Sequence, residues 1–169
     1  MGDKSAETHA KFLAFLKASE EAVWFLARWF SVNHNRAVQI YPTSKAKTHQ
    51  EWKKHVDQGD LYMRPEGADK FMRYEVKRLG VDFSGPHDWP FKPKFIVCAK
   101  HSYDNASPPP SSYFILNRDM TCMAIARGST HDKWTVEKRM DSRTNVAQEF
   151  YFCPMEHVIF HPVVDEEPF

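Results

Sequence analysis

Long apolar segments are absent from the sequence. It contains no run of about 18 or more consecutive apolar residues, the length that a membrane-spanning helix needs. The first residues, Met1 to Ser5, also lack the basic region and the apolar core of a secretory signal peptide. We therefore expect a soluble protein of the cytoplasm that has no membrane partner.

Cysteine and glycine are scarce, and neither sign of charge dominates. The three cysteines lie singly in apolar segments, which is typical of buried free thiols and not of disulfides. Six glycines against 13 Phe, 6 Tyr and 5 Trp exclude a low-complexity or disordered chain. With 23 basic and 22 acidic residues the chain is not a polycation, so a nucleic-acid surface would have to be local.

The length of 169 residues, of which 42% are hydrophobic, suits one well-buried core and is short for two. We therefore expect a single domain over residues 1–169. Its core would span about residues 10–100, and residues 113–161 would form a C-terminal extension of the sheet.

Apolar residues recur at steps of three and four from Ala10 to Phe30, which predicts an amphipathic helix that ends near residues 33–35. The apolar run at residues 95–100 is typical of a central strand covered on both faces. The Pro-rich stretches 82–94 and 101–112 are expected to be irregular. Further strands are predicted at residues 36–41, 59–63, 71–79, 113–116, 121–126, 150–153 and 158–160.

These elements predict an α/β fold, with α+β as the alternative. The N-terminal helix would pack on a central mixed β-sheet, and the C-terminal half would be irregular with extra strands. The segment 113–127 is predicted to form a hairpin that turns at residues 117–119. That hairpin belongs either to the core or to the edge of a homodimer.

Asp60, Glu75 and Lys77 lie in short apolar runs, where a strand that only packs would carry valine or leucine. In a strand, Arg73, Glu75 and Lys77 share one face. Pairing with the preceding strand would bring Asp60 beside Glu75. Two carboxylates suit Mg²⁺ or Mn²⁺, and a nearby ammonium can orient or help to deprotonate an attacking water and stabilise charge on a phosphate.

The pattern Gly59-Asp60 followed by Glu75-Val76-Lys77 resembles the Asp…Glu-x-Lys signature of the PD-(D/E)XK nuclease superfamily, which has the restriction-endonuclease-like fold. The predicted order of a helix, a strand, the strand with Asp60 and the strand with Glu75 agrees with that family. Gly59 stands where the family usually has proline. A Pro- and Gly-rich stretch stands where the family has a helix after Glu-x-Lys.

The resemblance implies a metal-dependent DNA nuclease that uses Mg²⁺, with Mn²⁺ as a substitute. Asp60 and Glu75 would be metal ligands, the Val76 carbonyl a further ligand, and Lys77 the catalytic lysine. Because the chain has no spare length for a recognition or processivity domain, we expect an endonuclease of structure-selective or low sequence specificity.

The resemblance also places a glutamate of the first helix near the metal, and Glu21 is the candidate, with Glu20 as the alternative. Contacts to the DNA backbone are expected from a basic segment that contains one tryptophan and from two arginines near the acidic pair. These residues are Lys45, Lys47, Trp52, Lys53, Lys54, Arg73 and Arg78.

The same residues allow functions other than a DNA nuclease. Asp60, Glu75 and Lys77 can instead form cross-strand ion pairs on a solvated face of the sheet. The chain would then be a non-catalytic domain that retains the nuclease fold and binds nucleic acid or protein. A nuclease directed at RNA is a further alternative.

Overall fold

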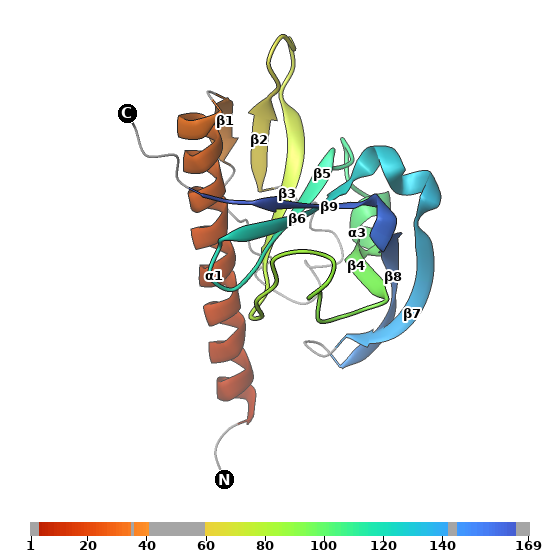
Figure 1. Cartoon of the computed structure of the whole chain (residues 1–169). Coiled ribbons are helices and arrows are strands. Elements are labelled where there is room, and N and C mark those ends of the chain that lie inside the picture. Colours follow the sequence, from red (N-terminus) through yellow and green to blue (C-terminus); the bar gives the residue numbers. More distant parts are fainter. Residues whose placement is uncertain (1–3, 35, 41–59, 142–144, 165–169) are drawn as a thin grey trace.

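The chain folds around a long helix and two β-sheets (Figure 1). The structure is a computed structural model that describes residues 4–34, 36–40, 60–141 and 145–164, with side chains of the first helix described at position 14 and from position 17 onwards. The elements are α1 (Lys4–Asn33), β1 (Ala37–Ile40), β2 (Leu61–Arg64), β3 (Met72–Arg78), β4 (Lys94–Ala99), α3 (Lys100–Asp104), β5 (Ser112–Leu116), β6 (Cys122–Arg127), η1 (Gly128–Lys133), β7 (Thr135–Asp141), β8 (Val146–Pro154), η2 (Met155–His157) and β9 (Val158–Pro162).

Helix α1 buries one face because its apolar residues repeat every three or four positions. On the opposite face, the Trp24 side chain is 65% exposed. The helix ends at Asn33, so the predicted helix and its end are confirmed, although the helix begins earlier than expected. The buried residues of this face are Ala22, Val23, Leu26, Ala27 and Trp29.

The larger sheet has six strands in the order β1-β2-β3-β5-β6-β9. Strands β3 and β5 are parallel, and every other neighbouring pair is antiparallel, so the sheet is mixed. The turn between β2 and β3 is closed by the Ala68 amide, which donates to the Pro65 carbonyl at 3.1 Å, and Gly67 supplies the positive φ of 74°. Because β3 and β5 are parallel, the chain must cross over between them, and β4 and α3 lie in this crossover.

Strands β4, β8 and β7 form a second, antiparallel sheet in that order. Figure 1 shows α1 on one side of the six-stranded sheet and the second sheet on the other. One core lies between α1 and the six-stranded sheet and includes Leu26, Leu61 and Phe114. The other core lies between the two sheets and includes Phe95 and Tyr113.

The fold is therefore α+β, the alternative of the two expected classes. All predicted strands among the described residues are present, and the hairpin of β5 and β6 turns where it was expected. The hairpin belongs to the core, the first of its two expected places, and it has no free edge for a dimer because β3 and β9 pair with its two outer sides. The three cysteines are buried free thiols, as predicted.

Other expectations for the second half of the chain are wrong. The C-terminal half is mostly regular, because β5 to β9 continue one sheet and build the other. The strand at residues 95–100 is not central, since among the described strands β4 pairs with β8 alone and the Ile96 side chain is 41% exposed. The stretch 101–112 begins with the last residues of α3. No helix in the described part of the chain is long and apolar enough to cross a membrane.

Candidate active site

The predicted antiparallel pairing of β2 and β3 brings the acidic residues to neighbouring positions. Leu61 pairs with Tyr74, and continuing this register by one residue places Asp60 opposite Glu75. Glu75 is also the register partner of Tyr113 on β5, whose side chain belongs to the core between the sheets. Glu75 therefore faces the second sheet.

Lys77 lies on the same face as Glu75. Its register partner on β5 is Ile115, which also belongs to the core between the sheets. The intervening residue, Val76, pairs with Phe114 in the core under α1. The alternation along β3 thus places both charged side chains on the face away from α1, as the period-two pattern predicts.

The Asp60 carboxylate is held at the backbone of the Glu-x-Lys segment. Its Oδ2 atom accepts a hydrogen bond from the Val76 amide at 2.9 Å. Asp60 precedes the first residue of β2, so its side chain satisfies a backbone donor of β3 just beyond the end of the paired strands. One carboxylate therefore lies directly against the backbone that carries Glu75 and Lys77.

The Glu75 carboxylate is bound by a buried arginine. Arg73 donates from Nε at 2.9 Å and from Nη2 at 2.7 Å to Oε1 of Glu75. The side chains of Arg73 and Glu75 are 3% and 12% exposed. Arg73 was predicted to contact a DNA phosphate, but its guanidinium contacts Glu75 and, through Nη1, the Pro108 carbonyl at 3.5 Å. Glu75 thus forms an ion pair, as the alternative to the nuclease expects, but it does so on a covered face and not on a solvated one.

The Lys77 ammonium lies between the two sheets. Its Nζ atom donates to the Val97 carbonyl of β4 at 2.6 Å and lies 5.5 Å from the centre of the Tyr113 ring. Neither contact was predicted from the sequence. The period of β3 indicated which face Lys77 occupies, but the elements that cover that face come from distant parts of the chain.

Two buried groups beside the lysine stay protonated at neutral pH. Burial raises the pKa of the Cys98 thiol, and the positive charge of Lys77 opposes this shift only in part. Burial, with the neighbouring Cys98 and Glu75, raises the pKa of Tyr113 far above its usual 10. Neither group therefore supplies an anionic nucleophile, and the chemistry of the site belongs to its carboxylates and its ammonium.

The structure does not bring the helix glutamate to the acidic pair. The Glu21 carboxylate lies 3.6 Å from Nη1 of Arg78, and its side chain is 54% exposed. Arg78 shares the α1 side of β3 with its register partner Leu116, so Glu21 and Glu75 are on opposite faces of the sheet. Glu20 is also exposed on α1.

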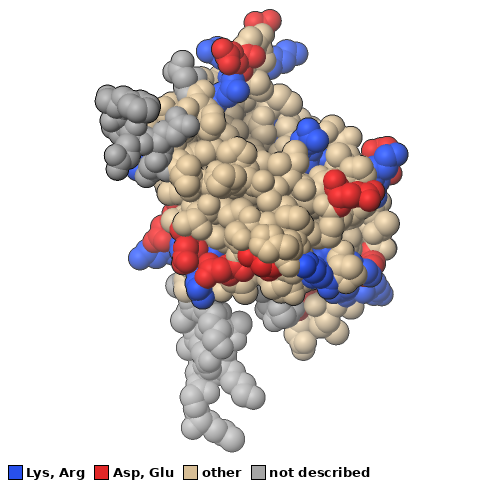
Figure 2. Space-filling model, in the orientation of Figure 1, with Lys and Arg blue, Asp and Glu red and all other residues tan. Residues whose placement is uncertain are grey.

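The predicted nucleic-acid contacts are only partly visible. Arg78 is half-buried, and its Nε and Nη2 atoms donate to the Arg118 carbonyl at 2.9 Å and 2.6 Å. On the face shown in Figure 2, basic and acidic side chains are mixed around the rim, and a broad central area carries neither. The remaining predicted contacts, Lys45, Lys47, Trp52, Lys53 and Lys54, lie outside the described residues.

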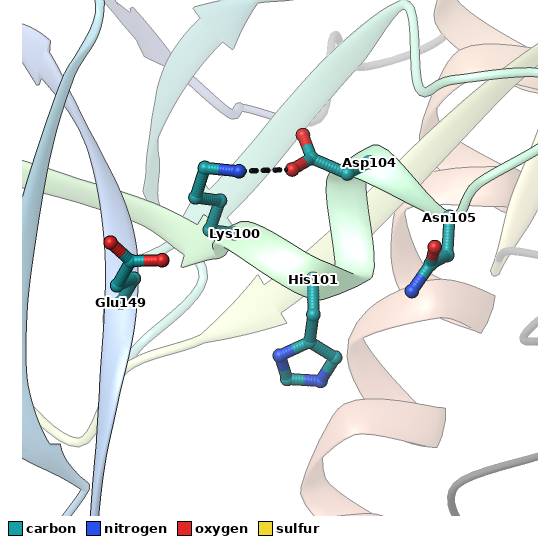
Figure 3. Close-up of a pocket in the computed structure, with 5 residues that line it drawn as sticks. All are labelled: Lys100, His101, Asp104, Asn105 and Glu149. Atoms are coloured by element: carbon teal, nitrogen blue, oxygen red, sulfur yellow. Dashed lines mark hydrogen bonds and ion pairs between the residues drawn. The ribbon is translucent and has the colours of Figure 1, made fainter.

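A polar cavity of about 260 Å³ opens beside α3 (Figure 3). Lys100 and Asp104 form an ion pair across one turn of this helix, and the Asp104 carboxylate also accepts a hydrogen bond from the Tyr151 hydroxyl at 2.8 Å. One ammonium and two carboxylates line this cavity, so it does not favour an anion such as phosphate. Its lining residues are Lys100, His101, Asp104, Asn105 and Glu149.

The described residues contain no group of three or more His, Cys, Asp or Glu side chains that could hold a metal ion. The predicted donor set is of a different kind, because it consists of the Asp60 and Glu75 carboxylates and the Val76 backbone carbonyl. All of these are hard oxygen donors, which are the ligands that Mg²⁺ prefers.

Comparison of the chain with protein-family models, with curated proteins and with solved structures finds no match. The assignment of a function therefore depends on the arrangement of the residues themselves.

Proposed function

We propose that the chain is a Mg²⁺-dependent endonuclease of the PD-(D/E)XK type that hydrolyses phosphodiester bonds of DNA. One observation carries the proposal. The Asp60 carboxylate lies against the Val76 amide at 2.9 Å, opposite Glu75 in the register of β2 and β3, and Glu75 and Lys77 share one face of β3. These residue types at these positions are the ones that the family signature requires.

The surrounding elements support the proposal. Helix α1 is followed by the antiparallel strands β1, β2 and β3, with Asp60 directly before β2 and Glu75 on β3. The resemblance also calls for a later buried strand. It was expected at residues 95–100, where β4 lies at the edge of the second sheet, and the fully buried strand beside β3 is β5 instead.

In this proposal Asp60, Glu75 and the Val76 carbonyl would hold Mg²⁺. When bound, Mg²⁺ supplies positive charge that activates a water molecule and neutralises the phosphate under attack. Lys77 adds a fixed positive charge on the same face, which stabilises the negative charge that develops on the phosphate. Arg73 orients the Glu75 carboxylate through its two hydrogen bonds to Oε1 and would compete with the metal for that carboxylate.

The same Arg73 contact favours the second candidate, a non-catalytic domain that retains the nuclease fold. Glu75 has a buried ion pair with Arg73, and Lys77 has a short hydrogen bond to the Val97 carbonyl. Groups with such partners can serve structure alone. Metal-dependent cleavage separates the two functions.

The test incubates the protein with supercoiled, linear, single-stranded and branched DNA and with RNA, in Mg²⁺, Mn²⁺ or EDTA. We expect cleavage of DNA in Mg²⁺ and Mn²⁺ and none in EDTA. Glu75→Ala and Lys77→Ala should lower the rate at least about 100-fold, since each removes a charge that acts on the transition state. The matched control is Glu149→Ala, which removes an exposed carboxylate outside the site.

The substrates also decide between the alternatives. Preference for branched DNA would support structure-selective cutting, and cleavage of RNA alone would replace DNA as the substrate. If the wild-type protein cleaves none of them in either metal, the enzyme proposal is wrong and the non-catalytic domain takes its place.

A further inference from the structure

Two groups from different elements hold the Lys77 ammonium. The Val97 carbonyl of β4 accepts its hydrogen bond at 2.6 Å, and the ring of Tyr113 on β5 lies 5.5 Å from Nζ. We propose that the Val97 carbonyl and the Tyr113 ring are the positioning groups of the catalytic lysine. This inference rests on the proposed nuclease function, because it presumes that Lys77 takes part in catalysis.

The Val97 carbonyl reaches Lys77 from an irregular position in the second sheet. In the pairing of β4 with β8, Ile96 is opposite Phe152 and Cys98 is opposite Tyr151, so Val97 has no partner in the register. This is a β-bulge, in which the extra residue leaves the regular ladder of hydrogen bonds. The bulge therefore places a carbonyl acceptor where the Lys77 side chain ends.

Tyr113 contributes its ring as a second contact. It is 3% exposed and belongs to the core between the sheets, so surrounding side chains fix its ring. The face of an aromatic ring attracts an ammonium ion, most strongly where water is excluded. Tyr113 is also the register partner of Glu75, so the same residue lies beside both the lysine and the proposed metal ligand.

Both contacts restrict the lysine side chain, whose flexibility is a disadvantage in a catalytic group. Its four-carbon side chain is flexible, and ordering it at the moment of reaction costs entropy. Lys77 is half-buried and anchored at its end by β4 and β5, so this ordering is complete before substrate binds. A charge fixed in advance stabilises a transition state more effectively than a mobile one.

The first test varies the ring at constant shape. Tyr113→Phe keeps the aromatic face, and the same variant made with phenylalanines that carry one, two or three fluorine atoms weakens its attraction for a cation stepwise. Tyr113→Phe is the reference against which the rates of the fluorinated variants are measured. Along the fluorinated series kcat should fall stepwise, by about tenfold in total, while KM for DNA stays within about twofold.

The control for packing is Phe95→Leu, which changes an equally buried ring of the same core whose ring contact is with Trp89. It should lower the melting temperature and leave kcat within about twofold of the wild-type value. A kcat that is constant along the fluorinated series, or that falls as far in Phe95→Leu, overturns the positioning role while the proposed function stands.

The second test does not depend on activity. In NMR spectra, the Cε protons of Lys77 should be shifted upfield by the Tyr113 ring, and a coupling across the hydrogen bond should join Nζ of Lys77 to the Val97 carbonyl carbon. Tyr113→Leu should abolish the upfield shift, and absence of both signals in the wild type overturns the inference. If both signals are present but the wild type cleaves no DNA, the contacts are structural, and both the proposed function and this inference are wrong.

Discussion

At the scale of single residues, the contact between Arg73 and Glu75 determines how much freedom the proposed ligand carboxylate has. Replacing one member of a buried ion pair leaves the charge of the other poorly compensated. We expect Arg73→Met to lower the free energy of unfolding by about 3 kcal/mol, measured by urea denaturation. Arg118→Met is the control, because Arg118 pairs with Asp82 at an exposed position, and it should change stability by less than about 1 kcal/mol.

The melting temperature of Arg73→Met with and without Mg²⁺ tests whether Glu75 binds the metal. If Glu75 is a metal ligand, Mg²⁺ should raise the melting temperature of Arg73→Met more than that of the wild type, because Arg73 no longer competes for the carboxylate. Glu75→Gln should remove most of this stabilisation. Equal shifts in all three proteins would mean that Mg²⁺ does not bind at Glu75.

A second residue-scale prediction concerns acid stability. Hydrogen bonds from the backbone and side chain of Ser84, then from the Gly85 amide, together with His87, lower the pKa of Asp88 from its usual 3.8 to about 2. Because the folded value is the lower one, the contribution of Asp88 is complete above pH 4 or so and is lost as the pH falls towards 2. Asp88→Asn should therefore melt below the wild type at pH 6, and the difference should shrink towards pH 2.

At the scale of elements, Asn117 joins the β5–β6 hairpin to the loop after β3. Its Oδ1 atom accepts the amides of Thr121 and Cys122, and its Nδ2 atom donates to the Phe83 carbonyl at 3.0 Å. The side chain is buried, so Asn117→Ala leaves several polar groups without these partners. We expect a loss of about 2–4 kcal/mol in thermal or urea unfolding. Asp119→Ala, in the exposed part of the same turn, should change stability by less than about 0.5 kcal/mol.

Elements whose signal is local could be predicted from the sequence. The three- and four-residue steps of α1 and the alternation of β3 arise within one segment, and the turn at residues 117–119 needs only its own residues. The pairing of β4 with β8 has no such local signal, because the two strands are far apart in the chain. The apolar run of β4 therefore suggested a central strand, although β4 lies at an edge.

Only part of the candidate site could be predicted from the sequence. Period two predicted that Arg73, Glu75 and Lys77 share a face, since this follows from β3 alone. It did not predict that the Val97 carbonyl would meet Lys77, because the bulge exists only in the pairing of β4 with β8. The register of α1 against the sheet was also beyond the sequence pattern, and it places Glu21 on the other face.

At the scale of the whole molecule, the six-stranded sheet separates two cores and belongs to both. Strand β5 sends Tyr113 and Ile115 into the core between the sheets, and it sends Phe114 and Leu116 into the core under α1. Neither core can lose its packing without exposing one face of β5. The proposed site lies on this shared sheet, with its side chains directed at the core between the sheets.

This sharing predicts that the described part of the chain unfolds in one cooperative step. Leu26→Ala removes buried volume from the core under α1, and Phe95→Ala removes it from the core between the sheets. Each should cost about 2–5 kcal/mol. In each variant, hydrogen exchange at the Leu116 amide and at the amide of Phe152, on the central strand of the second sheet, should accelerate by the same factor, because both amides open through the same global step. If Leu26→Ala accelerates exchange at Leu116 alone, the two cores unfold separately, and the expectation of a single domain is wrong.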